Sequence, residues 1–398
     1  MHVECTIITG VQMNLGISLS GGGVRALVFH LGVLARLAET DHWKSLTQIS
    51  TVSGGSLCIA LVFEKAGKKW PDSETYLNDC LPAIYKVLTE HNIQRMYVRD
   101  LFLRPWKLFQ GRAHVIGSLI AKHWGVTSDI ADIPIQPQWT INTTCYETGK
   151  NFRFSAKKMG DYKTEYVFDP RYSLADAVAA SAAVPGLIGP LKMKASKFKW
   201  HKFRDKDTNK PTYPIQPIGN TLTLWDGCMY DNLGVEFLYK PNEGLQEGIN
   251  FYLVSDASSP LGIVKRKWLA EYPLPRSPMR IVDIPMDQVR SLRSRLLFGF
   301  FHDTSYGGYI RIGESVPKIL KNLKYSDLES VPVDKCLNPN TVENIAEFKT
   351  TLRKLNAIEF SSLFRHGYET CNAVLVGTDK APFSIYNAAN FIWGEIDA

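Results

Sequence analysis

The sequence predicts an α/β fold of three layers, in which a mainly parallel central sheet carries helices on both faces. In the first half of the chain, short apolar strands alternate with helical segments, and this alternation is typical of a parallel sheet covered on both sides. The 398 residues, of which 45% are hydrophobic, suffice to bury a large core. We therefore expect a single domain over residues 1–398, with a core at about 12–260 and a helical C-terminal extension at about 261–398.

The first two expected strands are each followed by a helix. Residues 15–19 form an apolar run, and apolar side chains recur at helical spacing over residues 24–37. Residues 48–52 form a second strand, and residues 55–63 open a second helix. Gly21, Gly22 and Gly23 occupy the first strand-to-helix turn, which can hold a developing oxyanion, and Ser53 in the second turn can present a nucleophile. Together the two turns indicate acyl-transfer chemistry.

The middle of the chain continues the alternation. We expect helices at 70–106 and 174–183 and strands at 139–144, 152–155, 221–225 and 251–255. The first strand pair is joined by a turn at 147–150, and Pro185 with Gly186 stops the second helix. Beyond residue 260 the alternation weakens, and residues 286–301 and 342–369 read as two long helices.

The expected helix at residues 286–301 is amphipathic. Its apolar stripe contains Val289, Leu292, Leu296 and Phe300, while its arginines lie elsewhere on the helix. The ordinary interpretation is that the stripe faces the core and the basic side is solvated. The alternative is that this helix contacts a membrane or has a regulatory role.

Composition narrows the class of protein. No window of about eighteen unbroken apolar residues predicts a transmembrane helix, and the first residues lack the pattern of a secretory signal. Seven cysteines without paired short spacing fit free thiols in a reducing compartment, so we expect a cytoplasmic protein. Neither Cys-x-x-Cys nor His-Glu-x-x-His is present, so no metal site is expected.

The net charge of +7 is concentrated partly in Lys192–Lys210. There Lys197, Lys199 and Lys202 alternate with aromatic residues that include Trp200. The simpler interpretation is a surface strand with its lysines outward and its aromatic rings packed inward. The alternative is docking to an anionic bilayer, where each basic residue contributes about 1 kcal/mol and tryptophan favours the interface. No nucleic-acid-binding motif accompanies the charge, so we expect no nucleic-acid partner.

Three consecutive glycines, Gly21, Gly22 and Gly23, stand between the first strand and its helix. Without side chains, their N–H groups can approach an anion closely, and the helix N-terminus adds a partial positive charge. A phosphate would suit this turn as well as an oxyanion. The P-loop pattern is absent, however, and the dinucleotide fingerprint is matched only weakly. Arg25 offers a further donor or pairs with a structural carboxylate.

Ser53 stands at the second strand-to-helix turn. The pattern of a nucleophile elbow is Gly-x-Ser-x-Gly, and here the glycines that follow the serine are present while Thr51 replaces the first one. Ser53 is therefore a candidate nucleophile. The alternative is that its side chain only caps the helix that begins near Gly55.

Asp226 ends the expected strand at 221–225 and precedes Gly227. A carboxylate at the end of a strand lies where α/β sites form, and it can accept the proton of a serine as general base. The alternative is a turn aspartate that bonds its own backbone. Asp231 is a second candidate, which we expect to be a turn residue.

These segments, in this order, resemble the patatin-like phospholipase family, and the likeness extends through most of the chain. The segment Ser20–Ala26 is similar to the glycine-rich oxyanion loop of that family. Ser53 stands where its nucleophile stands, and Asp226 with Gly227 stands where its catalytic Asp-Gly pair stands. Ala179–Gly186 and Asp231–Gly234 also match family segments. Thr51 and Cys228 depart from the pattern, and neither removes a reacting group.

The resemblance implies a patatin-like three-layer fold and a serine lipid acyl hydrolase of phospholipase A or lysophospholipase type. It implies a Ser53–Asp226 dyad that needs no histidine, metal or other cofactor. The residues it assigns to the oxyanion hole are Gly21, Gly22, Gly23, Arg25 and Gly54. The substrate would be a phospholipid or lysophospholipid met at an anionic membrane, with peripheral membrane association, and an activating ligand or partner protein is a further option.

Two rival hypotheses remain. A Ser-His-Asp triad would need a histidine beside Ser53, and His302 and His366 follow Asp226 in the chain order of α/β-hydrolases. The rival from another class is a non-catalytic phosphate- or nucleotide-binding module that uses the Gly21–Gly23 loop.

Overall fold

The computed structural model describes residues 12–103, 111–186, 188–202, 213–262, 278–304 and 306–391. Its strands are β1 (Leu15–Leu19), β2 (Leu46–Val52), β3 (Gln138–Cys145), β4 (Lys150–Phe154), β5 (Lys158–Asp161), β6 (Glu165–Phe168), β7 (Leu191–Met193), β8 (Trp200–His201), β9 (Pro214–Ile215), β10 (Leu222–Asp226), β11 (Tyr239–Lys240), β12 (Gly244–Leu245), β13 (Phe251–Asp256) and β14 (Gly307–Arg311). Its α-helices are α1 (Gly23–Ala38), α2 (His42–Ser45), α3 (Gly54–Lys65), α4 (Ser73–Thr75), α5 (Leu81–Glu90), α6 (Ile93–Leu103), α7 (Arg112–Leu119), α8 (Leu174–Ser181), α9 (Cys228–Asp231), α10 (Pro278–Thr304), α11 (Val316–Asn322), α12 (Pro339–Ala346) and α13 (Ala357–Gly377).

One large mixed sheet organises the molecule. Its centre is parallel, with the strands in the order β14, β13, β1, β2 and β3. From β3 onward the pairing becomes antiparallel through β4, β5, β6, β8 and β9, and β10 pairs with both β3 and β7. The strands predicted from the sequence are all present, and the parallel part is the one that carries the strand-to-helix turns.

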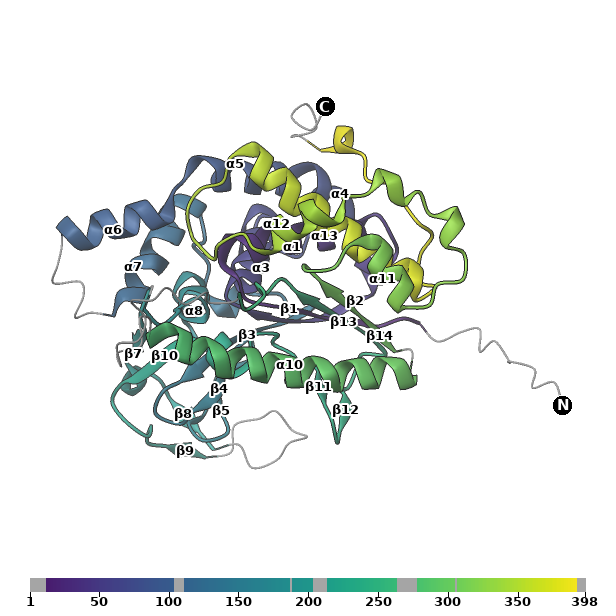
Figure 1. The fold of residues 1–398 in the computed structure, drawn as a ribbon. Helices are drawn as coiled ribbons and strands as arrows, with labels where there is room; N and C mark the ends of the chain where they lie inside the picture. The colour runs from purple at the N-terminus through teal and green to yellow at the C-terminus, as the bar shows by residue number, and fades with distance from the viewer. Residues whose placement is uncertain are drawn as a thin grey trace, which may run out of the picture.

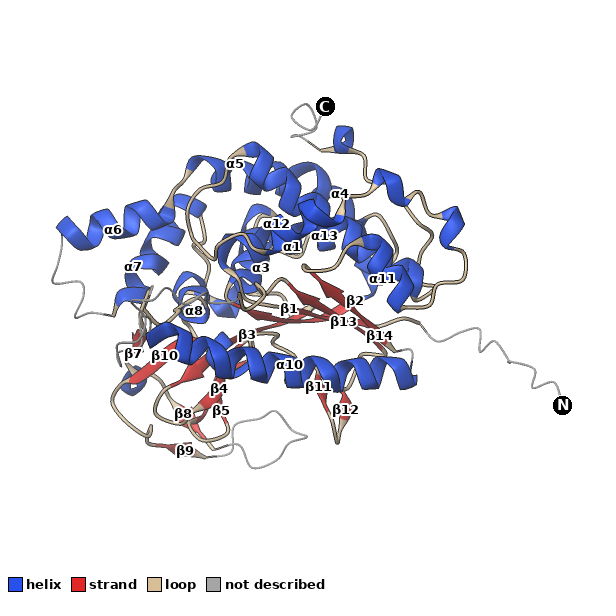
Figure 2. Cartoon of the chain, in the orientation of Figure 1, coloured by secondary structure: helices blue, strands red, loops and turns tan. Residues whose placement is uncertain are grey.

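Helices cover both faces of this sheet (Figures 1 and 2). Alternate residues of β13 show the division: Leu253 belongs to the large apolar core under α1, α3 and α13, whereas Tyr252 and Val254 point to a second, smaller core. Leu297 of α10 closes that second core. Because side chains of a strand alternate between its two sides, the sheet separates two helical layers. The predicted three-layer α/β fold is therefore confirmed.

The C-terminal part of the chain is built into these layers. β14 extends the parallel side of the sheet next to β13. α13 crosses α1 at very short distance, because a Cβ at Gly32 would lie 1.9 Å from the carbonyl oxygen of Phe364, and one at Gly367 would lie 1.9 Å from that of Phe29. Only glycine permits this approach of two helix backbones, so the two helices form one packed pair.

The prediction of a single long helix at residues 342–369 is wrong, because the structure has two helices there. α12 ends at Ala346, and α13 begins after Asn356, which forms a capping box with Glu359. The intervening residues turn toward the start of α1, where the carbonyl of Thr351 accepts the N–H of Val24 at 3.0 Å. The sequence analysis missed this break because apolar residues have helical spacing on both sides of it. The Asn-x-x-Glu pattern at residues 356–359 is nevertheless a start signal for a helix.

The expectation that the apolar stripe of residues 286–301 faces the core is wrong for most of the stripe, of which only Phe300 packs against the smaller core. Leu292 and Leu296 are exposed, whereas Arg290 is buried and Arg293 is largely covered. The arginines face inward because buried carboxylates there require a positive partner: Arg290 Nη1 lies 3.4 Å from Asp256 Oδ2. Pairing of charges, rather than burial of the stripe, sets the rotation of α10.

The basic segment at 192–202 has its lysines outward, and Lys197, Lys199 and Lys202 are exposed. Trp200 is 1% exposed, and its Nε1 donates to the carbonyl oxygen of Ala195 at 2.9 Å. Its assignment as a membrane-binding residue is therefore wrong, because an indole packed in the core cannot reach a bilayer. The remainder of this predicted basic segment, residues 203–210, lies outside the described residues.

The composition predicts no transmembrane helix and free cysteine thiols. Among the described helices, none has the combination of length and hydropathy that crossing a bilayer requires. The cysteines within these ranges are all free thiols.

Candidate active site

The two predicted reacting residues come together because the ends of two strands meet beside β3. β2 runs parallel to β3, and its last residue pair is Val52 with Asn142. β10 runs antiparallel to β3, and its last pair is Asp226 with Thr143. The carboxyl ends of β2 and β10 thus approach from opposite directions and reach neighbouring residues of one strand. Ser53, which follows β2, and Asp226 therefore line the same cavity.

Ser53 occupies a strained turn between β2 and α3. Its φ is 50° and its ψ is −113°, a conformation that costs a non-glycine residue about 1–3 kcal/mol. The side chain makes no capping hydrogen bond to α3, so the N-cap interpretation is wrong. The Ser53 N–H donates to Ser181 Oγ at 2.9 Å, which ties the turn to the end of α8. A sharp strand-to-helix turn of this kind is how an elbow presents its serine.

Thr51 replaces the first glycine of the elbow pattern for a structural reason. Its side chain is buried, its Oγ1 lies 2.9 Å from Ser56 Oγ, and it accepts from Trp139 Nε1 at 2.9 Å. These contacts hold the end of β2 against the first turn of α3. The threonine therefore supports the turn without entering the cavity.

Asp226 ends β10 with a fully buried carboxyl group. Its Oδ1 accepts the N–H of Cys228 at 2.8 Å, which is the turn contact of the simpler interpretation. Its Oδ2 is buried without a well-formed hydrogen bond among the described residues. Burial raises the pKa of this carboxyl to about 6, against the lowering effect of hydrogen bonding to Cys228 and of the nearby Ser53 hydroxyl. A pKa near neutrality suits a general base.

The glycine turn brings the N-terminus of α1 to the same place, next to the N-terminus of α3. Gly22 and Gly23 have φ values of 149° and 62°, which favour glycine. Among the described residues, the N–H groups of Gly22, Gly23 and Gly54 have no hydrogen-bond acceptor. Gly21 does have one, because its N–H donates to the carbonyl of Asn232 at 3.1 Å. Its assignment as an oxyanion donor is therefore wrong, and the turn offers the other three groups.

Arg25 mainly braces the glycine turn. Its Nε donates to the carbonyl of Ala257 at 3.1 Å, and its Nη1 donates to the carbonyl of Phe348. Burial lowers the pKa of this guanidinium to about 10, although the charge of Asp256 opposes the shift. Two of its nitrogens are thus committed to backbone oxygens, which gives Arg25 a structural role, but the side chain also lines the cavity of Ser53, so its role as an oxyanion donor stays a prediction.

Ser53 lies where two cavities of different character meet. The larger, of about 600 Å³, is lined by apolar residues such as Val184, Leu261 and Met286 together with the polar residues Ser53, Asp226, Asn232, Ser258, Arg280 and Arg290. The smaller, of about 130 Å³, is walled by Tyr97, Val98, Ile116, Val184, Ile188 and Leu352. The nucleophile candidate therefore borders a larger cavity that contains charged side chains and a smaller cavity that is walled mainly by apolar side chains.

Comparison with known proteins decides the family. The patatin-like phospholipase family model matches residues 17–239, which is more than half of the chain and includes both predicted reacting residues. The chain belongs to the patatin-like phospholipase family. No curated protein matches the sequence.

The similarity of this chain to solved structures is weaker than its match to the family model. Human GIVD cytosolic phospholipase A2 aligns over 93% of this chain and 61% of its own, at 13% identity and a TM-score of 0.47. The same human protein in complex with methyl gamma-linolenyl fluorophosphonate gives 12% identity and a TM-score of 0.44. VipD from Legionella pneumophila aligns over 61% of this chain and 49% of its own, at 15% identity and a TM-score of 0.29. This chain thus spans about three fifths of the human protein.

Several residues of the patatin-like site escaped the sequence analysis. Ser258 follows β13, just as the glycine turn follows β1 and Ser53 follows β2, so the rule that sites form at carboxyl ends of parallel strands could have found it. Arg280 and Asp283 reach the cavity from α10, and no local pattern marks them. Ser181 sits in a segment that resembles the family, but its hydrogen bond to the elbow is visible only in three dimensions.

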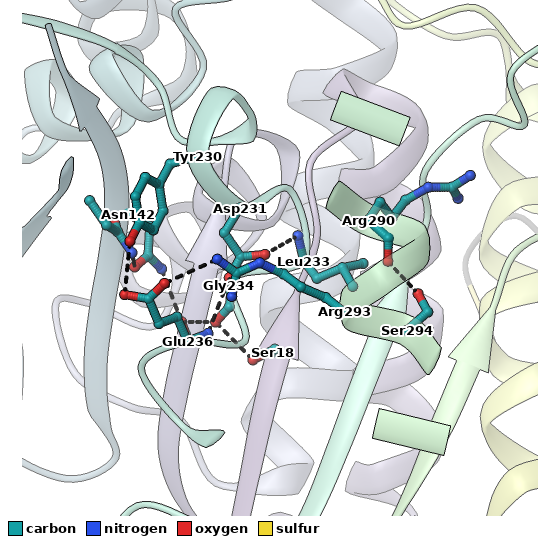
Figure 3. Close-up of polar contacts among 12 residues, drawn as sticks. Ser18, Asn142, Tyr230, Asp231, Leu233, Gly234, Glu236, Arg290, Arg293 and Ser294 are labelled. Carbon is teal, nitrogen blue, oxygen red and sulfur yellow. Dashed lines mark hydrogen bonds and ion pairs between the residues drawn. The ribbon is translucent and has the colours of Figure 1, made fainter. Parts of the chain in front are cut away.

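Asp231 is a turn residue, as expected, and it also anchors α10 (Figure 3). Its Oδ1 accepts the N–H of Leu233 at 3.1 Å. Its Oδ2 lies 3.5 Å from Arg293 Nη1, and Arg293 Nη2 donates to Glu236 Oε2 at 3.0 Å. These contacts fasten α10 to the segment that directly follows Asp226 in the chain.

The histidines of the rival triad lie away from the reacting pair, since neither His302 nor His366 lines the cavities. His366 is buried in α13, its Nε2 lies 2.6 Å from the carbonyl oxygen of Ile312, and burial lowers the pKa of the ring to about 4. Within the described ranges, no three His, Cys, Asp or Glu side chains gather in a way that would hold a metal ion.

Gly54 is expected to be irreplaceable, because a Cβ there would lie 2.3 Å from the carbonyl oxygen of Gly23. Gly54→Ala should push the elbow away from the glycine turn and lower kcat/KM for ester hydrolysis by roughly 100-fold or more, the effect of misplacing reacting groups by about 1 Å. Gly313→Ala, where no atom lies within 4 Å, is the control and should leave kcat/KM unchanged. Equal activity of both variants would show that contact between the two turns is not needed.

Proposed function

We propose that this protein is a serine lipid acyl hydrolase that cleaves fatty-acyl esters of phospholipids or lysophospholipids at a membrane surface. One observation carries the proposal: Ser53, on a strained elbow, shares a cavity with the buried carboxyl of Asp226, beside the N-termini of α1 and α3. Membership of the patatin-like phospholipase family supports the lipid substrate.

In the proposed reaction, Asp226 Oδ2 accepts the proton of Ser53 Oγ while Oγ attacks the carbonyl carbon of the ester. The negative charge that develops on the carbonyl oxygen would be stabilised by the N–H groups of Gly22, Gly23 and Gly54 and by the helix N-termini. Each such donor typically contributes about 3 kcal/mol. The ester C–O bond then breaks, and Asp226 returns the proton to the leaving alcohol.

The second half of the reaction uses the same groups. Asp226 takes a proton from a water molecule, whose oxygen attacks the carbonyl carbon of the acyl-Ser53 intermediate. The bond from the carbonyl carbon to Oγ breaks, Asp226 returns the proton to Oγ, and a fatty acid leaves.

The two cavities beside Ser53 support an ester with one polar and one apolar part. Arg280 in the larger cavity suits the negative charge of a phosphate head group, whereas Arg290 there is already paired with Asp256 and Asp287. The apolar walls of the smaller cavity, such as Ile116, Ile188 and Leu352, suit an acyl chain.

The test is incubation of the purified protein with phospholipid vesicles and with lysophospholipid, followed by mass spectrometry of the released fatty acid. A fluorophosphonate probe, which reacts with activated serines, is applied in parallel. The proposal expects fatty acid release and labelling. If neither occurs and a nucleotide binds with micromolar affinity, the rival phosphate- or nucleotide-binding function is correct. Labelling without turnover would indicate a hydrolase that requires an activating ligand or partner.

The dyad makes a prediction about His302. His302→Ala is expected to keep kcat within several-fold of the wild type, because the ring does not line the cavity that holds Ser53. His366→Asn serves as the second variant, compared at equal folded concentration because His366 is buried. A loss in kcat of roughly 1,000-fold or more for either variant would instead assign the base to a Ser-His-Asp triad.

A further inference from the structure

The exposed side of α10 differs from an ordinary solvated surface. Its exposed apolar side chains include Ile281, Ile284, Val289, Leu292 and Leu296, which we call the α10 apolar face. They recur three to five positions apart and so lie along one side of the helix. Ile281, Leu292 and Leu296 are each more than half exposed, at 58%, 54% and 51%.

Charge is almost absent from this side of the helix. Between residues 280 and 299, the other exposed positions are Pro285, Gln288, Arg295, Phe298 and Gly299, so a single cation and no carboxylate is exposed there. The carboxylates Asp283 and Asp287 instead line the large cavity. A helix whose outer side is apolar, with a positive charge at its edge, is complementary to an anionic bilayer.

The inner side of α10 explains why the apolar face cannot turn inward. Arg290 Nη1 pairs with Asp256. Figure 3 shows that Arg293 reaches Asp231 and Glu236, with which it pairs. Breaking such largely buried pairs would leave uncompensated charges and typically costs about 3–5 kcal/mol. The ion pairs therefore hold the apolar face outward.

The apolar face lies on the same part of α10 as residues that line the candidate active site. Arg280, Asp283 and Met286, on the same turns of α10 as Ile281 and Ile284, line the large cavity. A surface docked on these turns would lie beside the cavity that contains Ser53. Since the proposed substrate is a membrane lipid, a bilayer is the occupant that would bring substrate next to this cavity.

We propose that the α10 apolar face docks this protein on an anionic phospholipid bilayer. This rests on the proposed function for the choice of occupant, but vesicle binding can be measured without catalysis. Partial burial of the five side chains in the interface supplies the affinity, and Arg295 adds attraction to anionic head groups. The ion pairs on the inner side keep the helix in register with the cavity while its outer side is in lipid.

The test is flotation of the full chain with vesicles of phosphatidylcholine and phosphatidylglycerol. The variant Leu292→Gln/Leu296→Gln keeps helix propensity and removes apolar surface at two exposed sites, so it should fold normally. Its vesicle binding is expected to weaken by about tenfold or more, equivalent to about 1.4 kcal/mol. Its hydrolysis of a soluble short-chain ester should equal that of the wild type.

The matched control is Ile358→Gln/Ile385→Gln, at two apolar residues that are 64% and 47% exposed on α13 and on the segment beside it. This control should float with vesicles as the wild type does. Equal binding by the α10 variant and the wild type, or equal losses in the α10 and control variants, would overturn the proposal. So would loss of binding only when Lys197, Lys199 and Lys202 are neutralised.

A second copy of the chain is the competing occupant. Sedimentation velocity decides between them: a wild-type dimer that becomes monomeric in the α10 variant would overturn the bilayer assignment. A wild type that binds vesicles but hydrolyses neither lipid nor soluble ester would refute the proposed function and leave the docking face standing.

Discussion

Replacing Ser53 with alanine is expected to lower kcat for ester hydrolysis by about 10⁴- to 10⁶-fold, the range found when a catalytic serine is removed. The variant loses the oxygen that would form the acyl intermediate, whereas the glycine turn and Asp226 stay in place. Labelling by a fluorophosphonate probe should disappear completely. The fold should persist, because the Ser53 side chain makes no capping hydrogen bond.

The control for this variant is Ser56→Ala, three residues further along the same helix. The Ser56 hydroxyl is buried and lies 2.9 Å from both Thr51 Oγ1 and Ser181 Oγ. Its loss is expected to cost about 1 kcal/mol of stability while labelling is retained. If Ser53→Ala still hydrolyses lipid at the wild-type rate and is still labelled, Ser53 is not the nucleophile and the proposed function fails.

Asp226→Asn is expected to lower kcat by roughly 10⁴-fold, because the amide cannot accept the proton of Ser53. Asparagine keeps the oxygen that accepts the N–H of Cys228, so the turn after β10 is preserved. The control is Asp231→Asn, which weakens the contact with Arg293 and leaves the proposed base intact. A rate loss in the control as large as in Asp226→Asn would mean that the whole segment, and not one carboxylate, is what matters.

The same carboxyl predicts the pH dependence of the wild type. Burial raises the pKa of Asp226 to about 6, and only its ionised form can act as a base. kcat/KM is therefore expected to be level above about pH 7 and to fall tenfold per pH unit well below pH 6. A profile that stays level to pH 4.5 would exclude Asp226 as the group that controls the reaction.

The raised pKa also predicts a stability effect of the opposite sign from the loss of activity. Because the folded-state pKa of about 6 exceeds the model-peptide value of 3.8, proton binding favours the folded state below pH 3.8, and this contribution is lost as pH rises through 6. At pH 7 the ionised, buried Asp226 therefore costs up to about 3 kcal/mol. Asp226→Asn should unfold at a higher urea concentration than the wild type at pH 7, with the difference shrinking toward pH 4. A lower urea midpoint at pH 7 would contradict this.

Local sequence patterns predicted well those parts of the fold whose spacing reflects burial. β1, α1, β2 and α3 are found within about two residues of their expected bounds, because apolar periodicity records which side of an element is covered. Apolar periodicity did not predict the orientation of a helix where ion pairs determine which side faces the core. On α10 the stripe with Leu292 is exposed, because Arg290 and Arg293 must meet buried carboxylates from distant segments.

The sequence also predicted only some of the residues that line the candidate active site. The patterns around Gly22, Ser53 and Asp226 stood out because glycines, a serine between a strand and a helix, and an aspartate at a strand end each have a local physical reason. The sequence could not show that the N–H of Gly21 is already engaged in a hydrogen bond, since its acceptor, the carbonyl of Asn232, lies more than two hundred residues away in the chain. Trp200 was misassigned for a similar reason, because its burial depends on the sheet around it.

The sequence by itself determined the strand-to-helix turns, the glycine-rich anion site and the types of the two reacting residues, because each depends on backbone geometry within a few positions. Tertiary structure alone decided that Ser53 and Asp226 meet. They do so because β2 and β10 end head to head on neighbouring residues of β3, one parallel and the other antiparallel to it. That juxtaposition depends on β2 and β10 each pairing with β3, which is distant from both in the sequence, and burial by the surrounding layers then gives Asp226 its raised pKa.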